Sequence, residues 1–135
     1  MKRTRRAIVL LALSLAACGG GDATPAKSSS AATKPGAEPM AATEAKALFE
    51  SLCFTCHGLT GHGDGPGAAA LNPKPRTFVD AAWQDSVTDE QIQKTIVYGG
   101  AAVGKSPMMP AQPQLKGKTE TLQALTRIVR DFRAK

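Results

Sequence analysis

Aromatic side chains are scarce in this chain of 135 residues, which has four Phe, one Trp and one Tyr. Few aromatics leave little material for a hydrophobic core, so another group is expected to help fill it. Cysteine is also rare, with three residues. With 42% apolar and 21% charged residues, the composition excludes both a disordered tail and a multi-span membrane protein. The composition is that of one small folded domain with additional segments.

Positive charge is concentrated at the start of the chain. Of the formal net charge of +6, four units come from Lys2, Arg3, Arg5 and Arg6, so the chain from Cys18 onward carries only +2. Basicity confined to a leader is typical of export rather than of nucleic-acid recognition. We therefore expect no nucleic-acid partner.

The first 17 residues have the anatomy of a secretory signal peptide. The basic cluster is followed by an apolar run of eleven residues, Ala7 to Ala17, which is too short to cross a bilayer. The run ends in Leu15-Ala16-Ala17-Cys18, which resembles the lipobox of bacterial lipoproteins. The resemblance implies that residues 1–17 are removed and that Cys18 is acylated, which would anchor the protein to a bacterial membrane on its periplasm-facing side. An ordinary signal with an incidental cysteine is the alternative.

Residues 18–42 have the composition of a linker. After Cys18 they are almost entirely Gly, Ala, Ser, Thr and Pro, and Met40 is their only large apolar residue. Such a segment buries too little surface to offset the entropy of ordering it. We therefore expect a flexible tether, followed by one domain over residues 43–135.

The strongest chemical signal is Cys53-Phe54-Thr55-Cys56-His57, which has the C-x-x-C-H spacing that attaches c-type haem. On a helical turn, positions i, i+3 and i+4 share a face, so Cys53 and Cys56 can bond one macrocycle while His57 points at its iron. The alternatives are a thioredoxin-like redox pair, which needs a βαβ context, and half of a zinc site, which needs further ligands. The sequence offers neither context. With Cys18 acylated, no free thiol and no disulfide remain.

A second axial ligand is available in Pro107-Met108-Met109-Pro110. Met/His ligation raises the reduction potential and closes the iron to substrates, which suits one-electron transfer. With the stretches CFTCHGLTGHGDGPGAAALNPKPRTF, SVTDEQIQKTIVYGG and SPMMPAQPQL, the chain resembles the class I cytochrome c family, the monohaem bacterial domain, over residues 42–135. In that family the sixth ligand commonly precedes a proline, which favours Met109 and leaves Met108 as the alternative.

The resemblance also implies roles for residues around the haem. In similar cytochromes a proline carbonyl accepts the hydrogen bond of the ligand histidine, and Pro75 is the best match, with Pro73 as the alternative. Arg76 and Trp83 lie where family members often place groups near the haem propionates. A surface charge and a core aromatic are the competing interpretations of these two residues.

The glycine-rich loop of residues 61–65, Gly-His-Gly-Asp-Gly, is not a phosphate cradle. It lacks the Lys-Ser/Thr of a P-loop, and no strand precedes it. We expect its glycines to let the backbone pass close to the haem. His62 in this loop is expected to be exposed and not to bind the iron.

Three segments have the apolar periodicity of helices. The first covers residues 43–55, with Thr43 as its expected N-cap. The second begins with the capping-box spacing Thr88-Asp89-Glu90-Gln91 and ends at Gly99-Gly100. The third covers residues 119–133 and is expected to cross the first, as in class I cytochromes.

These helices leave two long loops rich in Pro and Gly, residues 58–84 and 99–118. No alternating apolar pattern is long enough to require a sheet. We therefore expect an all-α fold of the small cytochrome c type, in which three main helices and the long loops wrap one covalently bound haem c.

The leading functional hypothesis is an extracytoplasmic electron carrier between membrane-associated redox partners, not an enzyme by itself, and expected to be a monomer. The first alternative is an electron-relay subunit of an oxidase, dehydrogenase or reductase. A second alternative leaves the iron open, for peroxide chemistry or for sensing a small gas. No distal His or Arg constellation favours that reading. Five scattered lysines could steer an acidic partner, although a solvated surface is the simpler explanation: Lys46, Lys74, Lys105, Lys116 and Lys118.

Overall fold

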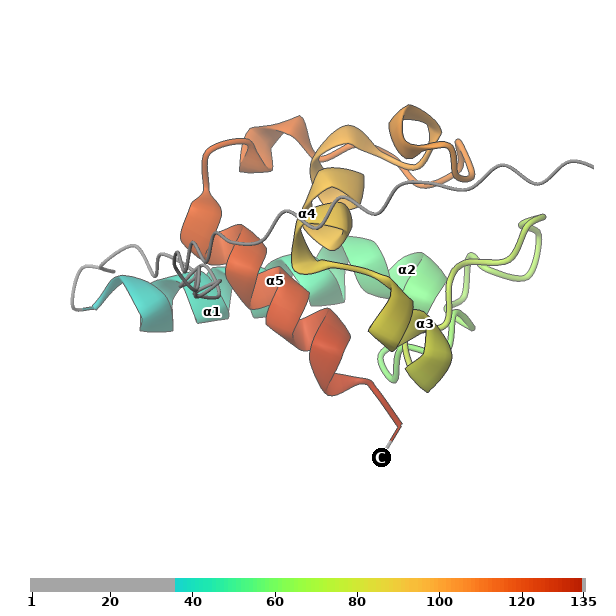
Figure 1. The fold of residues 1–135 in the computed structure, drawn as a ribbon, viewed down its shortest axis with the longest axis horizontal. Helices are drawn as coiled ribbons and strands as arrows, with labels where there is room; N and C mark the ends of the chain where they lie inside the picture. Colours follow the sequence, from blue (N-terminus) through green and yellow to red (C-terminus); the bar gives the residue numbers. More distant parts are fainter. Residues whose placement is uncertain (1–35, 135) are drawn as a thin grey trace, which may run out of the picture. The chain divides into compact units, whose positions relative to one another are not determined.

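The computed structural model describes residues 36–134, and within this part of the chain the regular structure is entirely helical (Figure 1). The elements in chain order are α1 (Ala37–Leu48), η1 (Phe49–Cys53), α2 (Phe54–His57), α3 (Ala81–Ser86), α4 (Asp89–Tyr98), η2 (Ala101–Val103), η3 (Pro113–Leu115) and α5 (Thr119–Asp131). The predicted all-α fold class is confirmed. Cys18 and the expected signal peptide, residues 1–17, lie outside the described residues.

The first helix begins earlier than the sequence indicated. It starts at Ala37, after Gly36 in the left-handed conformation with φ 98°, and not at Thr43. Thr43 is not an N-cap, because its hydroxyl donates to the carbonyl of Pro39 at 2.9 Å inside the helix. Residues 37–42, which we assigned to the flexible linker, are therefore helical. Alanine has the highest helix propensity, and a proline is tolerated in a first turn.

A π-turn lies between α1 and the haem-attachment motif. Across η1, the amide of Phe54 donates to the carbonyl of Phe49, five residues back, and the hydroxyl of Ser51 donates to the carbonyl of Ala47 at 2.7 Å. The wider turn adds one residue to the helical path, which rotates everything after it by about 100° relative to a regular α-helix. Phe49 thus stays buried while Cys53 comes to a half-buried position.

The segment expected to be one long loop after α2 contains a short helix. Asp80 caps α3, accepting a hydrogen bond from the amide of Trp83 at 3.2 Å. The capping box predicted for α4 is confirmed, because Thr88 and Gln91 exchange bonds of 2.9 and 3.2 Å. The helix ends at Tyr98, before Gly99 with φ 78°, as expected.

The C-terminal helix α5 packs across α1, as predicted (Figure 1). The core lies between these helices and α4, and the rings of Phe49 and Phe132 meet at 5.5 Å between centroids. The buried apolar residues of this core are Ala45, Phe49, Phe78, Ile92, Val97, Leu115, Leu122, Ala124, Leu125 and Val129. None of the helices within residues 36–134 has both the length and the apolar character needed to cross a membrane.

Candidate functional site

The two motif cysteines lie on successive helical turns, Cys53 at the end of η1 and Cys56 in α2. Both side chains are half-buried, and no disulfide joins them. Burial, and to a smaller extent the neighbouring Cys56, raises the pKa of the Cys53 thiol to about 11. A thiol with a high pKa forms little of the reactive thiolate, so the burial of Cys53 disfavours a thioredoxin-like redox pair.

His57, the last residue of α2, is held in one tautomer. Its Nδ1 donates to the carbonyl oxygen of Arg76 at 3.1 Å, and a carbonyl can only accept, so the hydrogen lies on Nδ1 and Nε2 keeps a free lone pair. Burial lowers the pKa of His57 below its ordinary value of 6.5, and the bond to Arg76 opposes this shift. The ring is therefore neutral near pH 7, the form that binds a metal.

The acceptor of this bond corrects one prediction. We expected the carbonyl of Pro75, and the structure uses that of the next residue, Arg76. The Pro75 carbonyl instead faces Gly63, where a β-carbon would approach it to 2.6 Å. The sequence pattern places the acceptor only to within a residue or two, because the choice of carbonyl depends on the path of the folded loop.

The face of the His57 ring is covered by Phe78, a residue that the sequence analysis missed. The two rings are stacked, with 4.4 Å between centroids and 16° between planes. Phe78 stacks in turn on Trp83 at 5.6 Å, and the guanidinium of Arg76 lies 5.8 Å from the Trp83 ring centroid. Arg76 and Trp83 are thus brought together beside His57. Phe78 is 21 residues from His57 and lies in an irregular segment, so no local pattern marks it.

The glycine-rich loop packs against the motif's own backbone. The amides of Gly67, Gly65 and Gly63 donate to the carbonyls of three consecutive residues, Thr55 at 2.7 Å, Cys56 at 3.2 Å and His57 at 2.9 Å. These carbonyls, at the end of a helix, have no partner within it. The glycines therefore let the loop approach α2, and the expected approach to the haem stays a prediction. His62 is exposed, as expected, and its Nδ1 lies 3.1 Å from Oγ1 of Thr60.

The two candidate methionines differ in burial. Met108 is 56% exposed, whereas the side chain of Met109 is half-buried. The carbonyl of Met109 accepts a hydrogen bond from Gly100 at 3.0 Å, which fastens this loop to the end of α4. A β-carbon on Gly100 would lie 2.0 Å from the carbonyl oxygen of Ser106, so the loop also needs glycine there.

The residues present suit a large apolar macrocycle that carries a metal. Two thiols and one neutral imidazole lie on adjoining turns. Large apolar side chains are exposed next to the motif and at the end of α4, with Leu52 at 47%, Leu59 at 62% and Tyr98 at 49%. A macrocycle that covered these side chains would remove apolar surface from water. By contrast, nowhere in residues 36–134 do three His, Cys, Asp or Glu side chains gather as a zinc site requires.

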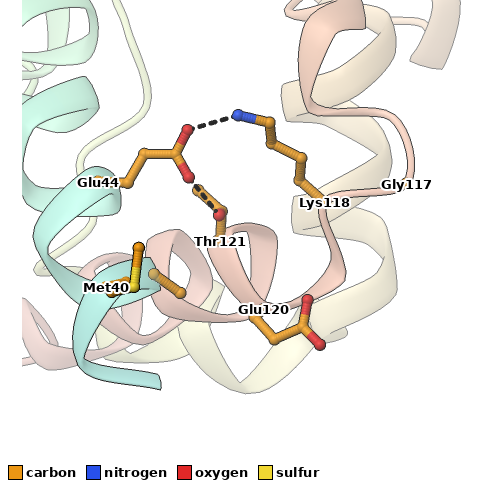
Figure 2. Close-up of a pocket in the computed structure, with 7 residues that line it drawn as sticks. Met40, Glu44, Gly117, Lys118, Glu120 and Thr121 are labelled. Atoms are coloured by element: carbon orange, nitrogen blue, oxygen red, sulfur yellow. Dashed lines mark hydrogen bonds and ion pairs between the residues drawn. The ribbon is translucent and has the colours of Figure 1, made fainter. Parts of the chain in front are cut away.

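One hollow lies away from these residues and offers no chemistry of its own. It has a volume of about 520 Å³ and lies between the beginnings of α1 and α5 (Figure 2). Glu44 crosses it, accepting from Lys118 Nζ at 2.6 Å and from the Thr121 hydroxyl at 2.7 Å (Figure 2). Because Glu44 is bonded to both Lys118 and Thr121, these contacts link α1 to the beginning of α5.

Comparison with known proteins agrees with this site. Residues 40–127 match the family described as "Cytochrome C oxidase, cbb3-type, subunit III". The chain belongs to this cytochrome c family. A solved structure, the KustC0563 c-type cytochrome, is 34% identical over 64% of this chain and 94% of that chain, with a TM-score of 0.48. No curated protein matches the chain.

Membership of the family implies a covalently bound haem c with its iron, and the C-x-x-C-H residues Cys53, Cys56 and His57 match that requirement. The cytochrome is therefore a haem-based electron carrier. Domains of this kind generally exchange electrons with redox partners. The recognition of a monohaem cytochrome c domain from the sequence is confirmed.

Proposed function

We propose that this cytochrome is a lipid-anchored, periplasm-facing one-electron carrier whose iron is held by His57 and Met109. The observation that carries the proposal is the fixed tautomer of His57, which leaves Nε2 as the only ring nitrogen free for a metal. Bound haem supplies a one-electron couple that a six-coordinate site can cycle without binding substrate.

The chain's own residues divide the work of holding the cofactor. Cys53 and Cys56 form the two thioether bonds that prevent its loss, and the Arg76 carbonyl keeps the proton on Nδ1 of His57. Met109 is preferred to Met108 as the sixth ligand because a ligand side chain points inward, and Met108 is the more exposed of the two. Arg76 and Trp83, packed together beside His57, remain candidates for contact with the haem propionates.

The anchor rests on the sequence alone. Cleavage before Cys18 and acylation of its thiol would leave a tether that lets the domain reach partners near the membrane. Full-length wild-type and Cys18→Ala proteins, expressed in a bacterium that matures c-type cytochromes, separate the alternatives. We expect the wild-type protein to be in the membrane fraction and to carry the added mass of the lipid. The Cys18→Ala protein should lack the added mass and should not be in the membrane fraction. An unmodified Cys18 would contradict the anchor while leaving electron transfer untouched.

Strong electrostatic steering of a partner is not part of the proposal. Lys46 is paired with Glu50 at 2.8 Å, Lys118 is paired with Glu44, and Lys74 donates to two backbone carbonyls at 3.0 and 2.7 Å. Three of the five lysines considered for steering are thus engaged locally. We expect partner docking to depend weakly on ionic strength.

Absorption spectra of the mature protein test the central claim. Covalent haem is first verified by mass, and oxidised and reduced spectra are then recorded with and without carbon monoxide. A low-spin spectrum with the weak far-red methionine-to-iron band, unchanged by the gas, supports His/Met ligation. A high-spin iron that binds the gas readily contradicts it and favours the open-site alternative, a peroxidase or gas sensor.

A second candidate is an electron-relay subunit of a larger oxidoreductase. The family description, which names an oxidase subunit, favours this candidate. Mild solubilisation and purification of the tagged protein from its host distinguish the two roles. Stoichiometric recovery of a catalytic partner indicates a subunit, whereas recovery of the cytochrome alone indicates an independent carrier.

A further inference from the structure

We propose that Phe78 is a positioning residue that fixes the plane of the His57 ring. The inference rests on the proposed role of His57 as an axial ligand. It starts from the stacked pair, in which the Phe78 ring lies 4.4 Å from the imidazole and within 16° of parallel to it.

Two different contacts are needed to hold an imidazole. The bond from Nδ1 to the Arg76 carbonyl sets the direction of one ring nitrogen, but the ring can still pivot about the line of that bond. A flat surface against the ring face removes this freedom, because any pivot drives ring atoms into the neighbouring ring. Arg76 therefore sets the tautomer and Phe78 sets the plane.

Phe78 is itself held firmly. Its amide donates to the carbonyl of Gly61 at 2.6 Å, and its carbonyl accepts from Nε2 of Gln84 at 2.8 Å. The residue is only 8% exposed, and its ring is backed by Trp83 at 5.6 Å and by Phe132 at 6.2 Å. A residue fixed through its backbone on both sides and through its ring can impose an orientation on its neighbour.

Gln84 connects this arrangement to the C-terminal helix. Its side chain is buried, and its second Nε2 hydrogen goes to the carbonyl of Val129 at 2.8 Å. Its Oε1 accepts from Nη1 of Arg130 at 2.9 Å. Every polar atom of the Gln84 side chain is thus bonded, and α5 supports the segment that carries Phe78.

The orientation of an axial imidazole plane can be read directly in a ferric low-spin haem protein. The plane directs unpaired spin toward particular edges of the macrocycle, so together with the orientation of the sixth ligand it sets the order and spread of the four haem-methyl proton resonances. General loss of stability does not change this pattern as long as the protein remains folded. The pattern therefore separates a positioning role from simple packing.

The test compares Phe78→Leu with Phe132→Leu in the haem-loaded protein. Both variants lose one ring of the same aromatic cluster, but Phe132 is one ring further from His57. We expect Phe78→Leu to change the order or narrow the spread of the haem-methyl resonances, and to shift the reduction potential. Phe132→Leu should lower the thermal midpoint and leave the resonance order as in wild type. Phe78→Tyr, which keeps a flat ring, should restore the wild-type pattern.

Equal changes in both leucine variants, or no change in Phe78→Leu, would overturn the proposal. If Phe78→Leu does not accumulate as folded haem protein, Phe78→Met takes its place, because an unbranched side chain adapts to the same volume without a flat face. Failure of His/Met ligation itself is recognised separately, because the wild-type spectrum would then lack the low-spin signature.

Discussion

A β-carbon on Gly65 would lie 2.5 Å from the carbonyl oxygen of Thr55 and 2.2 Å from that of Phe54. The close approach lets the amide of Gly65 reach the carbonyl of Cys56 at 3.2 Å. The end of the haem-bearing helix is thus closed by a loop that has no room for a side chain at Gly65.

Gly65→Ala should therefore disrupt the motif directly. Because both close atoms belong to backbone, the loop must move, and we expect a loss of at least about 2 kcal/mol in the free energy of unfolding, with a lower yield of haem protein. Gly104→Ala is the control, since its β-carbon would meet nothing within 4 Å and only its φ of 70° is strained. This control should lower the free energy of unfolding by only about 1 kcal/mol, the cost of placing an L-residue in the left-handed conformation. Urea unfolding measures both, and equal losses would contradict the steric argument.

Met109→Ala should change the absorption spectrum and Met108→Ala should not, although the two residues are adjacent. The half-buried Met109 is the proposed ligand, so its truncation should abolish the far-red band and let the reduced protein bind carbon monoxide. Truncation of the exposed Met108 should leave the spectrum unchanged. If Met108→Ala alone removes the band, the assignment of the ligand is reversed.

Arg130 joins three helices, and its removal should be costly. It donates to the backbone carbonyl of Gln84 at 2.6 Å and to that of Val87 at 2.7 Å, and it pairs with Asp89. Arg130→Met leaves these partly buried acceptors unsatisfied, and we expect a loss of about 2–4 kcal/mol in stability.

Arg127 on the same helix is the matched control for Arg130. Within residues 36–134 its one ion pair is with Glu38 at 4.0 Å, and both side chains are exposed. Arg127→Met should therefore change the free energy of unfolding by less than about 0.5 kcal/mol. Comparable losses in the two variants, measured by denaturant unfolding, would show that the Arg130 network does not carry the stability assigned to it.

The bridge from α1 to α5 should weaken in acid. Hydrogen bonds from Lys118 and Thr121 hold the pKa of Glu44 below its ordinary value of 4.5. A carboxyl with a lower pKa in the folded state stabilises the fold fully above its unfolded pKa, and the contribution is lost as the pH falls through the folded pKa. Glu44→Gln should therefore reduce the fall in unfolding free energy between about pH 7 and about pH 3.

Glu120→Gln provides the comparison for Glu44. Glu120 lines the same hollow but takes no part in the bridge to Lys118 (Figure 2). Its replacement should leave the pH dependence of stability close to that of wild type. Identical pH profiles for wild type and Glu44→Gln would rule out the bridge as a source of acid sensitivity.

Local patterns determined the class of this protein and the residues that attach its cofactor. The C-x-x-C-H spacing, the Thr88–Gln91 capping box and the apolar period of α5 each act within a few residues, so they can be recognised without a fold. The start of α1 at Ala37 was missed because small residues suit both a linker and a helix. The six residues of α3 were too few to show a period.

Only the tertiary structure decided how His57 is held. Its hydrogen-bond acceptor, Arg76, is 19 residues away, and its stacking partner, Phe78, lies in the same irregular segment. The path of the loop after His57 decides which carbonyl and which ring contact the imidazole. That path is set by the hydrogen bonds of Gly63 and Gly65 to α2 and by the bond from Gln84 to the carbonyl of Phe78. These contacts join distant parts of the chain, so they exist only once the helices have packed.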